Sequence, residues 1–120
     1  MALPVSVPSH CALMKPAAER FAESVEALNW QAPQIPLVQN VSAAVAADLD
    51  TLKRDLLEQL YKPVRWVESV QTLAANGATE LVECGPGKVL AGLNKRCADG
   101  VSTANLNTPD AFAAARAALA

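Results

Sequence analysis

The chain has 120 residues, of which 52% are hydrophobic and 18% charged, and its formal net charge is −2 at pH 7. This composition excludes an intrinsically disordered chain, and the charge balance leaves no overall electrostatic footprint for nucleic acid. The length suits one modest domain or a piece of a larger one.

Hydrophobic spacing in the first half predicts strands that alternate with helices. A short strand over residues 3–7 is followed by a helix over residues 11–29, in which apolar positions recur every three or four residues. A strand around residues 35–41 precedes a helix that Asp48 or Asp50 caps. The apolar face of the first helix consists of Leu13, Ala17, Phe21, Val25 and Leu28.

The second half continues this alternation. A helix over residues 64–76 ends at Gly77, and a strand over residues 79–84 leads through a Gly-Pro-Gly turn into a helix over residues 88–97. A strand over 102–106 and an Ala-rich helix from Pro109 complete the chain. The pattern predicts an α/β fold with short parallel strands flanked by helices. Because parallel sheets normally have both faces covered, so thin a sheet indicates that part of the domain lies upstream.

The sequence also predicts a cytoplasmic protein. No apolar run approaches the ~20 residues that a membrane-spanning helix needs, and residues 1–7 lack the basic region and apolar core of a signal peptide. Cys11, Cys84 and Cys97 have no regular spacing, which favours reduced thiols over a disulfide framework. The cysteines and the single histidine form no visible zinc-ligand group.

The turn at residues 85–87 is one candidate site. It delivers a strand to a helix N-terminus, where free N–H groups can meet an anion or a carbonyl oxygen. The spacing matches neither of the glycine-rich nucleotide-binding motifs. A turn that serves only the fold is the simpler interpretation of this motif alone.

His10 is the second candidate. It lies between a predicted strand and a predicted helix, a position from which side chains often face a site. Histidine is the natural general base for activating a hydroxyl, although a lone histidine is more often structural. No convincing nucleophile accompanies it. In extended chain, neighbouring side chains point to opposite faces, so neither Ser9 nor Cys11 can easily reach the imidazole of His10. Cys84 and Cys97 are expected to be small buried side chains.

Three ordered segments carry a family resemblance. They are PVSVPSHCALM at residues 4–14, QLYKPVRW at residues 59–66 and ECGPGKVL at residues 83–90. Together they resemble the histidine segment, the Q-L-x-x-P-V-x-W stretch and the G-P-G-K-V-L turn of bacterial malonyl-CoA:acyl carrier protein transacylases. The likeness extends over nearly the whole chain, which resembles the C-terminal part of these enzymes.

The resemblance implies roles for three residues. His10 corresponds to the catalytic base, which takes a proton from a serine hydroxyl and returns it to the departing thiol in a ping-pong reaction. Gln59 corresponds to the residue whose backbone carbonyl orients the imidazole, and Val89 to a residue lining the acyl pocket. The implied reaction transfers malonyl from malonyl-CoA to the phosphopantetheine thiol of acyl carrier protein, with no cofactor and no metal.

The resemblance also implies what this chain lacks. The family's G-H-S-x-G nucleophile elbow, its carboxylate-binding arginine and its oxyanion glutamine have no counterpart here. Residues 1–8 are expected to be the last strand and exit of a ferredoxin-like small subdomain, and residues 9–120 a portion of the α/β-hydrolase-like large subdomain. We therefore expect the chain alone to be inactive, and its full-length parent to be a monomer.

Two alternatives remain open from the sequence. One is the related acyltransferase domain of a polyketide synthase, which loads malonyl or methylmalonyl units. The other is a non-catalytic fragment that binds carrier protein, with Lys88, Lys95 and Arg96 facing an acidic partner. Ordinary solvated surface charges are the simpler interpretation of these three residues.

Overall fold

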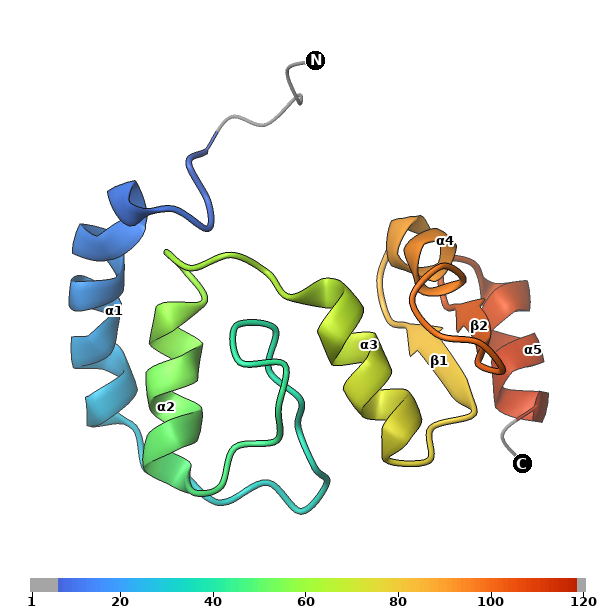
Figure 1. The fold of residues 1–120 in the computed structure, drawn as a ribbon, viewed down its shortest axis with the longest axis horizontal. Helices are drawn as coiled ribbons and strands as arrows, with labels where there is room; N and C mark the ends of the chain where they lie inside the picture. The colour runs from blue at the N-terminus through green and yellow to red at the C-terminus, as the bar shows by residue number, and fades with distance from the viewer. Residues whose placement is uncertain (1–6, 119–120) are drawn as a thin grey trace. The chain divides into compact units, whose positions relative to one another are not determined.

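The computed structural model describes residues 7–118, which belong to two compact units (Figure 1). The first unit ends at Ser69 and the second begins at Val70, within helix α3 (Trp66–Ala75). The expected strand over residues 3–7 lies, apart from Val7, outside the described residues. None of the helices in the described part has the length and apolar character needed to cross a membrane.

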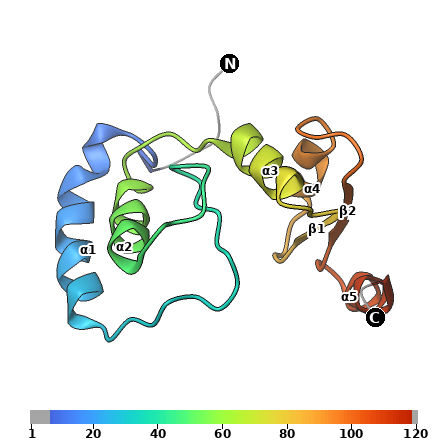
Figure 2. The ribbon, with the colours of Figure 1, turned by 60° about the horizontal axis from the view of Figure 1, so that its bottom comes forward.

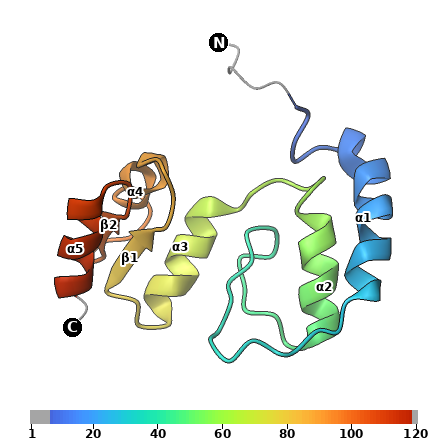
Figure 3. The same ribbon diagram turned by 180° about the vertical axis from the view of Figure 1, so that it is seen from behind.

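Two helices form the frame of the first unit. A short 3₁₀ turn, η1 (Ala12–Met14), leads into α1 (Lys15–Ala27), which packs beside α2 (Leu49–Glu58) (Figure 3). Asp48 caps α2 because its side chain accepts a hydrogen bond of 2.7 Å from the backbone N–H of Thr51. This cap settles the expected choice between Asp48 and Asp50.

The buried face of α1 agrees only in part with the face predicted by its apolar residues. Leu13, Phe21 and Leu28 are 75%, 39% and 61% exposed, whereas Ala18 and Val25 are 4% and 1% exposed. At about 100° per residue, Ala18 and Val25 lie at one edge of the predicted stripe, to which Val25 itself belongs. The small side chain of Ala18 belongs to the face that packs on α2, whereas Leu13, Phe21 and Leu28 remain exposed.

The strand expected around residues 35–41 does not form. Only an isolated antiparallel bridge joins Val38 to Val45, and the loop between them turns back at Ala43, whose φ is +55°. Pro36, the second residue of the expected strand, has no N–H to contribute to a ladder. The loop at residues 38–45 is instead held by its own hydrogen bond from Ala43 N–H to the Gln39 carbonyl, at 2.8 Å.

The second unit contains the parallel sheet. Strands β1 (Glu80–Glu83) and β2 (Ser102–Asn105) pair in parallel with Glu80 opposite Ser102. Helices α4 (Val89–Asn94) and α5 (Pro109–Ala118) flank them, α4 in contact with both strands and α5 with β2 (Figure 2). The α/β class and its parallel pairing are thus confirmed, and Gly77, at φ +92°, ends α3 as predicted.

Candidate functional site

His10 has a backbone conformation that is rare for its residue type. Its φ is +61°, in the left-handed region, which costs a non-glycine residue roughly 1 kcal/mol. Its backbone N–H donates to the carbonyl of Leu60 at 2.9 Å. Such strain persists where surrounding contacts hold it, and it is common at functional sites.

The imidazole of His10 is held by a second carbonyl from the same turn. Nδ1 lies 2.8 Å from the backbone oxygen of Gln59. Because a carbonyl only accepts hydrogen bonds, the neutral ring carries its proton on Nδ1. The lone pair of Nε2 is then free on an exposed side chain, which is the arrangement that a general base requires.

The two carbonyls are available because of how α2 ends. The N–H groups of Tyr61 and Lys62 both donate to the Glu58 carbonyl, and Pro63 has no N–H with which to continue the helix. The carbonyls of Gln59 and Leu60 are therefore left beyond the helical ladder. His10 uses both, so it also caps the C-terminus of α2. Sequence reasoning did not find Leu60, because a backbone carbonyl leaves no sequence signal.

Two side chains that follow His10 in the sequence have contacts of their own. The ammonium of Lys15, at the start of α1, lies 5.8 Å from the centre of the Tyr61 ring, within the range of a cation–π interaction. This contact joins the segment that follows His10 to the turn that holds it. The thiol of Cys11 donates to the Pro8 carbonyl at 3.1 Å, so it is not directed at the imidazole.

In the second unit, two N–H groups at the start of α4, just after the Gly-Pro-Gly turn, are already paired. The carboxylate of Glu83 accepts hydrogen bonds from Leu90 N–H at 3.3 Å and from Ala91 N–H at 2.9 Å. The carboxylate of Glu83, at the end of β1, thus occupies the position at the start of α4 where an anion would bind. A Cβ added at Gly85 or Gly87 would meet no atom within 4 Å.

The remaining sequence candidates of this unit lie on α4 and at the end of β1. Val89 is the first residue of α4 and is 71% exposed. Cys97 is buried, as expected, and its thiol donates to the Leu93 carbonyl at 3.3 Å. Cys84 is exposed, so the expectation that it is buried was wrong. It follows the last residue of β1, where the chain leaves the sheet for the turn.

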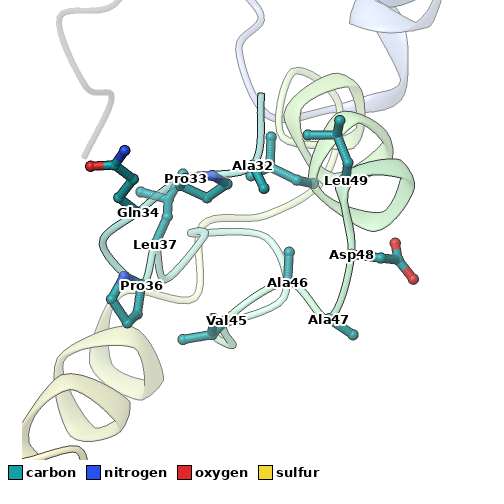
Figure 4. A pocket seen from close by; sticks show the side chains of 11 residues that line it. Ala32, Pro33, Gln34, Pro36, Leu37, Val45, Ala46, Ala47, Asp48 and Leu49 are labelled. Atoms are coloured by element: carbon teal, nitrogen blue, oxygen red, sulfur yellow. The ribbon is translucent and has the colours of Figure 1, made fainter. Parts of the chain in front are cut away.

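A hollow of about 290 Å³ lies in the first unit (Figure 4), and neither His10 nor Gln59 is among the residues that line it. Its walls are the segments 32–37 and 45–52, and its lining is apolar except for Gln34 and Asp48. These two side chains lie at opposite sides of the hollow, and Asp48 is already occupied as the cap of α2 (Figure 4). The hollow therefore offers volume without a reactive group.

Comparison with known proteins gives a consistent result. No protein-family model matches the sequence. Malonyl CoA-acyl carrier protein transacylase of Escherichia coli K12 is 50% identical over 113 residues, which are 94% of this chain and 37% of that protein. The enzyme of the same name from Bacillus subtilis is 44% identical over 108 residues, 90% of this chain and 34% of that protein.

Solved structures agree with these relatives. Malonyl-CoA:acyl carrier protein transacylase of Xanthomonas oryzae superposes with a TM-score of 0.90 at 49% identity, covering 97% of this chain and 37% of that one. A malonyl-transacylase in complex with a type II polyketide acyl carrier protein gives a TM-score of 0.87 at 43% identity, over 94% of this chain and 37% of that one. The chain spans little more than a third of the length of these proteins, and over nearly all of its own length it is homologous to the C-terminal part of malonyl CoA-acyl carrier protein transacylases.

Proposed function

We propose that this chain supplies the general-base part of a malonyl-CoA:acyl carrier protein transacylase. The observation that carries this proposal is the 2.8 Å contact between His10 Nδ1 and the Gln59 carbonyl, which leaves Nε2 unprotonated in the neutral ring. The contact joins two of the three segments on which the family resemblance rests. The homology to malonyl transacylases supplies the substrate class.

The chemistry assigned to His10 is a double proton transfer. Nε2 accepts the proton of a serine hydroxyl, contributed by the upstream part of the enzyme, as the serine oxygen attacks the malonyl thioester. The resulting imidazolium returns that proton to the departing CoA thiolate, which leaves a malonyl-serine ester. The same two steps run again with the phosphopantetheine thiol of the carrier protein as attacking group and serine as leaving group.

Gln59 acts in this scheme through its backbone and not through its side chain. A neutral carbonyl fixes the tautomer and the direction of the ring, but it stabilises the imidazolium less than a carboxylate does. The position of the carbonyl at the end of α2 offsets part of this difference, because a helix C-terminus carries partial negative charge. In this proposal Val89 lines the acyl pocket of the complete enzyme.

A second candidate is malonyl transfer to the carrier protein of a polyketide synthase. One of the similar solved structures is a malonyl-transacylase bound to a type II polyketide carrier protein. The chemistry assigned to His10 is the same in both cases. The two candidates therefore differ in the acceptor protein and not in the mechanism.

The test joins this chain to the part of the Escherichia coli relative that precedes the matched 113 residues. We call this fusion the hybrid. Holo acyl carrier protein is incubated with malonyl-CoA and either the hybrid or the chain alone, and malonyl loading is followed by intact mass. We expect loading by the hybrid and none by the chain alone. Loading by the chain alone would sink the proposal, because it would require a nucleophile within these 120 residues.

A further inference from the structure

The turn that holds His10 is anchored at its far end by Arg65. The backbone N–H of Arg65 donates to the Asn40 carbonyl at 2.7 Å, and its guanidinium Nη1 donates to the Ser42 carbonyl at 2.9 Å. Both acceptors belong to the loop at residues 38–45. Arg65 therefore fixes the exit of the turn to this loop through two independent hydrogen bonds.

Glu68 sets the direction of the guanidinium. Its Oε2 accepts from Arg65 Nε and its Oε1 from Nη2, each at 2.7 Å, so the pair is bidentate. The hydrogen bonds and opposite charges raise the pKa of Arg65 and lower the pKa of Glu68. An exposed ion pair of this kind adds little to overall stability. The ion pair matters for geometry instead, because it holds the guanidinium with Nη1 directed at the Ser42 carbonyl.

The loop at residues 38–45 is in turn fixed to α2. The side-chain amide of Gln39 donates to the Leu52 carbonyl at 2.9 Å, and Gln39 is 7% exposed. The contacts form a closed ring, which runs along α2 into the turn, through Arg65 into the loop and through Gln39 back to α2. The carbonyls of Gln59 and Leu60 lie in the part of this ring between α2 and Arg65, which is fixed at both ends.

We propose that Arg65, oriented by Glu68, is a positioning residue for His10. It holds the turn so that the Gln59 carbonyl stays aligned with Nδ1, and it thereby keeps Nε2 as the basic nitrogen. The part of this inference that concerns catalysis rests on the proposed function, whereas the alignment of His10 does not. Arg65 itself touches neither the imidazole nor a substrate.

The test uses the fact that the chain has a single histidine. In ¹⁵N NMR spectra of the 120-residue chain, at a pH where the ring is neutral, the two ring nitrogens report the ratio of the Nδ1–H to the Nε2–H tautomer. We expect Arg65→Gln to lower this ratio about fivefold, the effect of losing the alignment of one hydrogen bond. Circular dichroism shows whether each variant retains the wild-type fold.

Lys62→Gln is the matched control. Lys62 lies in the same turn and pairs with Glu58 at 2.7 Å, and its side chain is 46% exposed against 47% for Arg65. It has no hydrogen bond to the loop at residues 38–45, so its loss should leave the tautomer ratio unchanged. If the loss of a surface positive charge from this turn were enough to change the tautomer ratio, the ratio would change equally in both variants.

A folded Arg65→Gln variant with the wild-type tautomer ratio would overturn the inference, and so would an equal shift in Lys62→Gln. If Arg65→Gln does not fold, Glu68→Ala decides in the same way, because it removes both oxygens that orient the guanidinium and keeps Arg65. In the hybrid, we expect Arg65→Gln to lower kcat with little change in KM. If the wild-type hybrid is inactive while the NMR shift is present, the proposed function fails and the positioning role stands.

Discussion

The imidazole Nδ1 of His10 lies 2.8 Å from the backbone oxygen of Gln59, although 49 positions separate the two residues in the sequence. The backbone N–H of His10 meets the next carbonyl, that of Leu60, at 2.9 Å. One residue thus caps the end of α2 and presents a free Nε2. The structural and the catalytic interpretations of His10 are compatible, and substitutions can separate them.

Replacing Gln59 by Ala should leave the tautomer of His10 unchanged. The contact uses the backbone carbonyl, which every residue type provides. We expect the ¹⁵N tautomer ratio of the chain to equal that of the wild type, and malonyl transfer by the hybrid to change by less than about fivefold, since no hydrogen bond of the imidazole is lost. A shift to the Nε2–H tautomer would show that the Gln59 side chain is needed.

The left-handed backbone of His10 predicts an unusual order of stabilities. Both His10→Ala and His10→Gly lose the ring hydrogen bond, but glycine adopts φ +61° without strain. We expect the Gly variant to have a free energy of unfolding about 1 kcal/mol higher than the Ala variant. Urea titrations followed by circular dichroism measure this difference, and an Ala variant as stable as the Gly variant would contradict the assigned conformation.

Glu83 should contribute to stability as the cap of α4. Its carboxylate accepts from the N–H groups of Leu90 and Ala91, so Glu83→Ala should cost about 1 kcal/mol of unfolding free energy. Glu83→Gln retains one acceptor oxygen and should cost less. Glu80→Ala on the same strand serves as the control. Equal losses at positions 80 and 83 in a urea titration would argue against the cap.

Asp48 should make the first unit more stable at neutral than at acidic pH. Hydrogen bonds from Thr51 lower the pKa of Asp48 below its ordinary value. A group with a lowered pKa stabilises the fold above the pKa of its unfolded state, and this contribution is lost as the pH falls through the folded-state pKa. We expect the urea midpoint to fall less between pH 7 and pH 3 in Asp48→Asn than in the wild type. An equal fall in both would remove Asp48 as a source of the pH dependence.

Thiol reactivity provides a check on the second unit. Cys84 is exposed, whereas Cys97 is buried and donates to the Leu93 carbonyl. Because alkylation requires an accessible thiolate, iodoacetamide should modify Cys84 well before Cys97. Peptide mass mapping at short reaction times distinguishes the two sites. Faster labelling of Cys97 would contradict its burial.

Local signals in the sequence predicted the elements that depend on local physics. Asp48 and Gly77 mark helix ends by capping and by positive φ, and both act as expected. The apolar spacing of α1 predicted the burial of Val25 but not the exposure of Leu13, Phe21 and Leu28, since exposure depends on the helix that packs against this face. A strand was expected around residues 35–41 because the apolar residues of this segment resemble one, but only the isolated bridge from Val38 to Val45 forms there.

The candidate site was harder to predict from the residues alone. His10 stood out as the single histidine, but its partners are backbone carbonyls, which any sequence would offer. Gln59 was identified as a site residue by the family resemblance and not by the chemistry of its side chain. Arg65 and Leu60 could be recognised only once the turn and the loop at residues 38–45 were placed in space.

The role of His10 as the base is tested most directly by the rate of malonyl transfer by the hybrid carrying His10→Asn. Asparagine tolerates a positive φ, so this variant keeps the backbone conformation while losing the basic nitrogen. We expect kcat/KM to fall by at least about a hundredfold, with unchanged circular dichroism. A His10→Asn hybrid that transfers malonyl at the wild-type rate would contradict the assignment of His10 as the base.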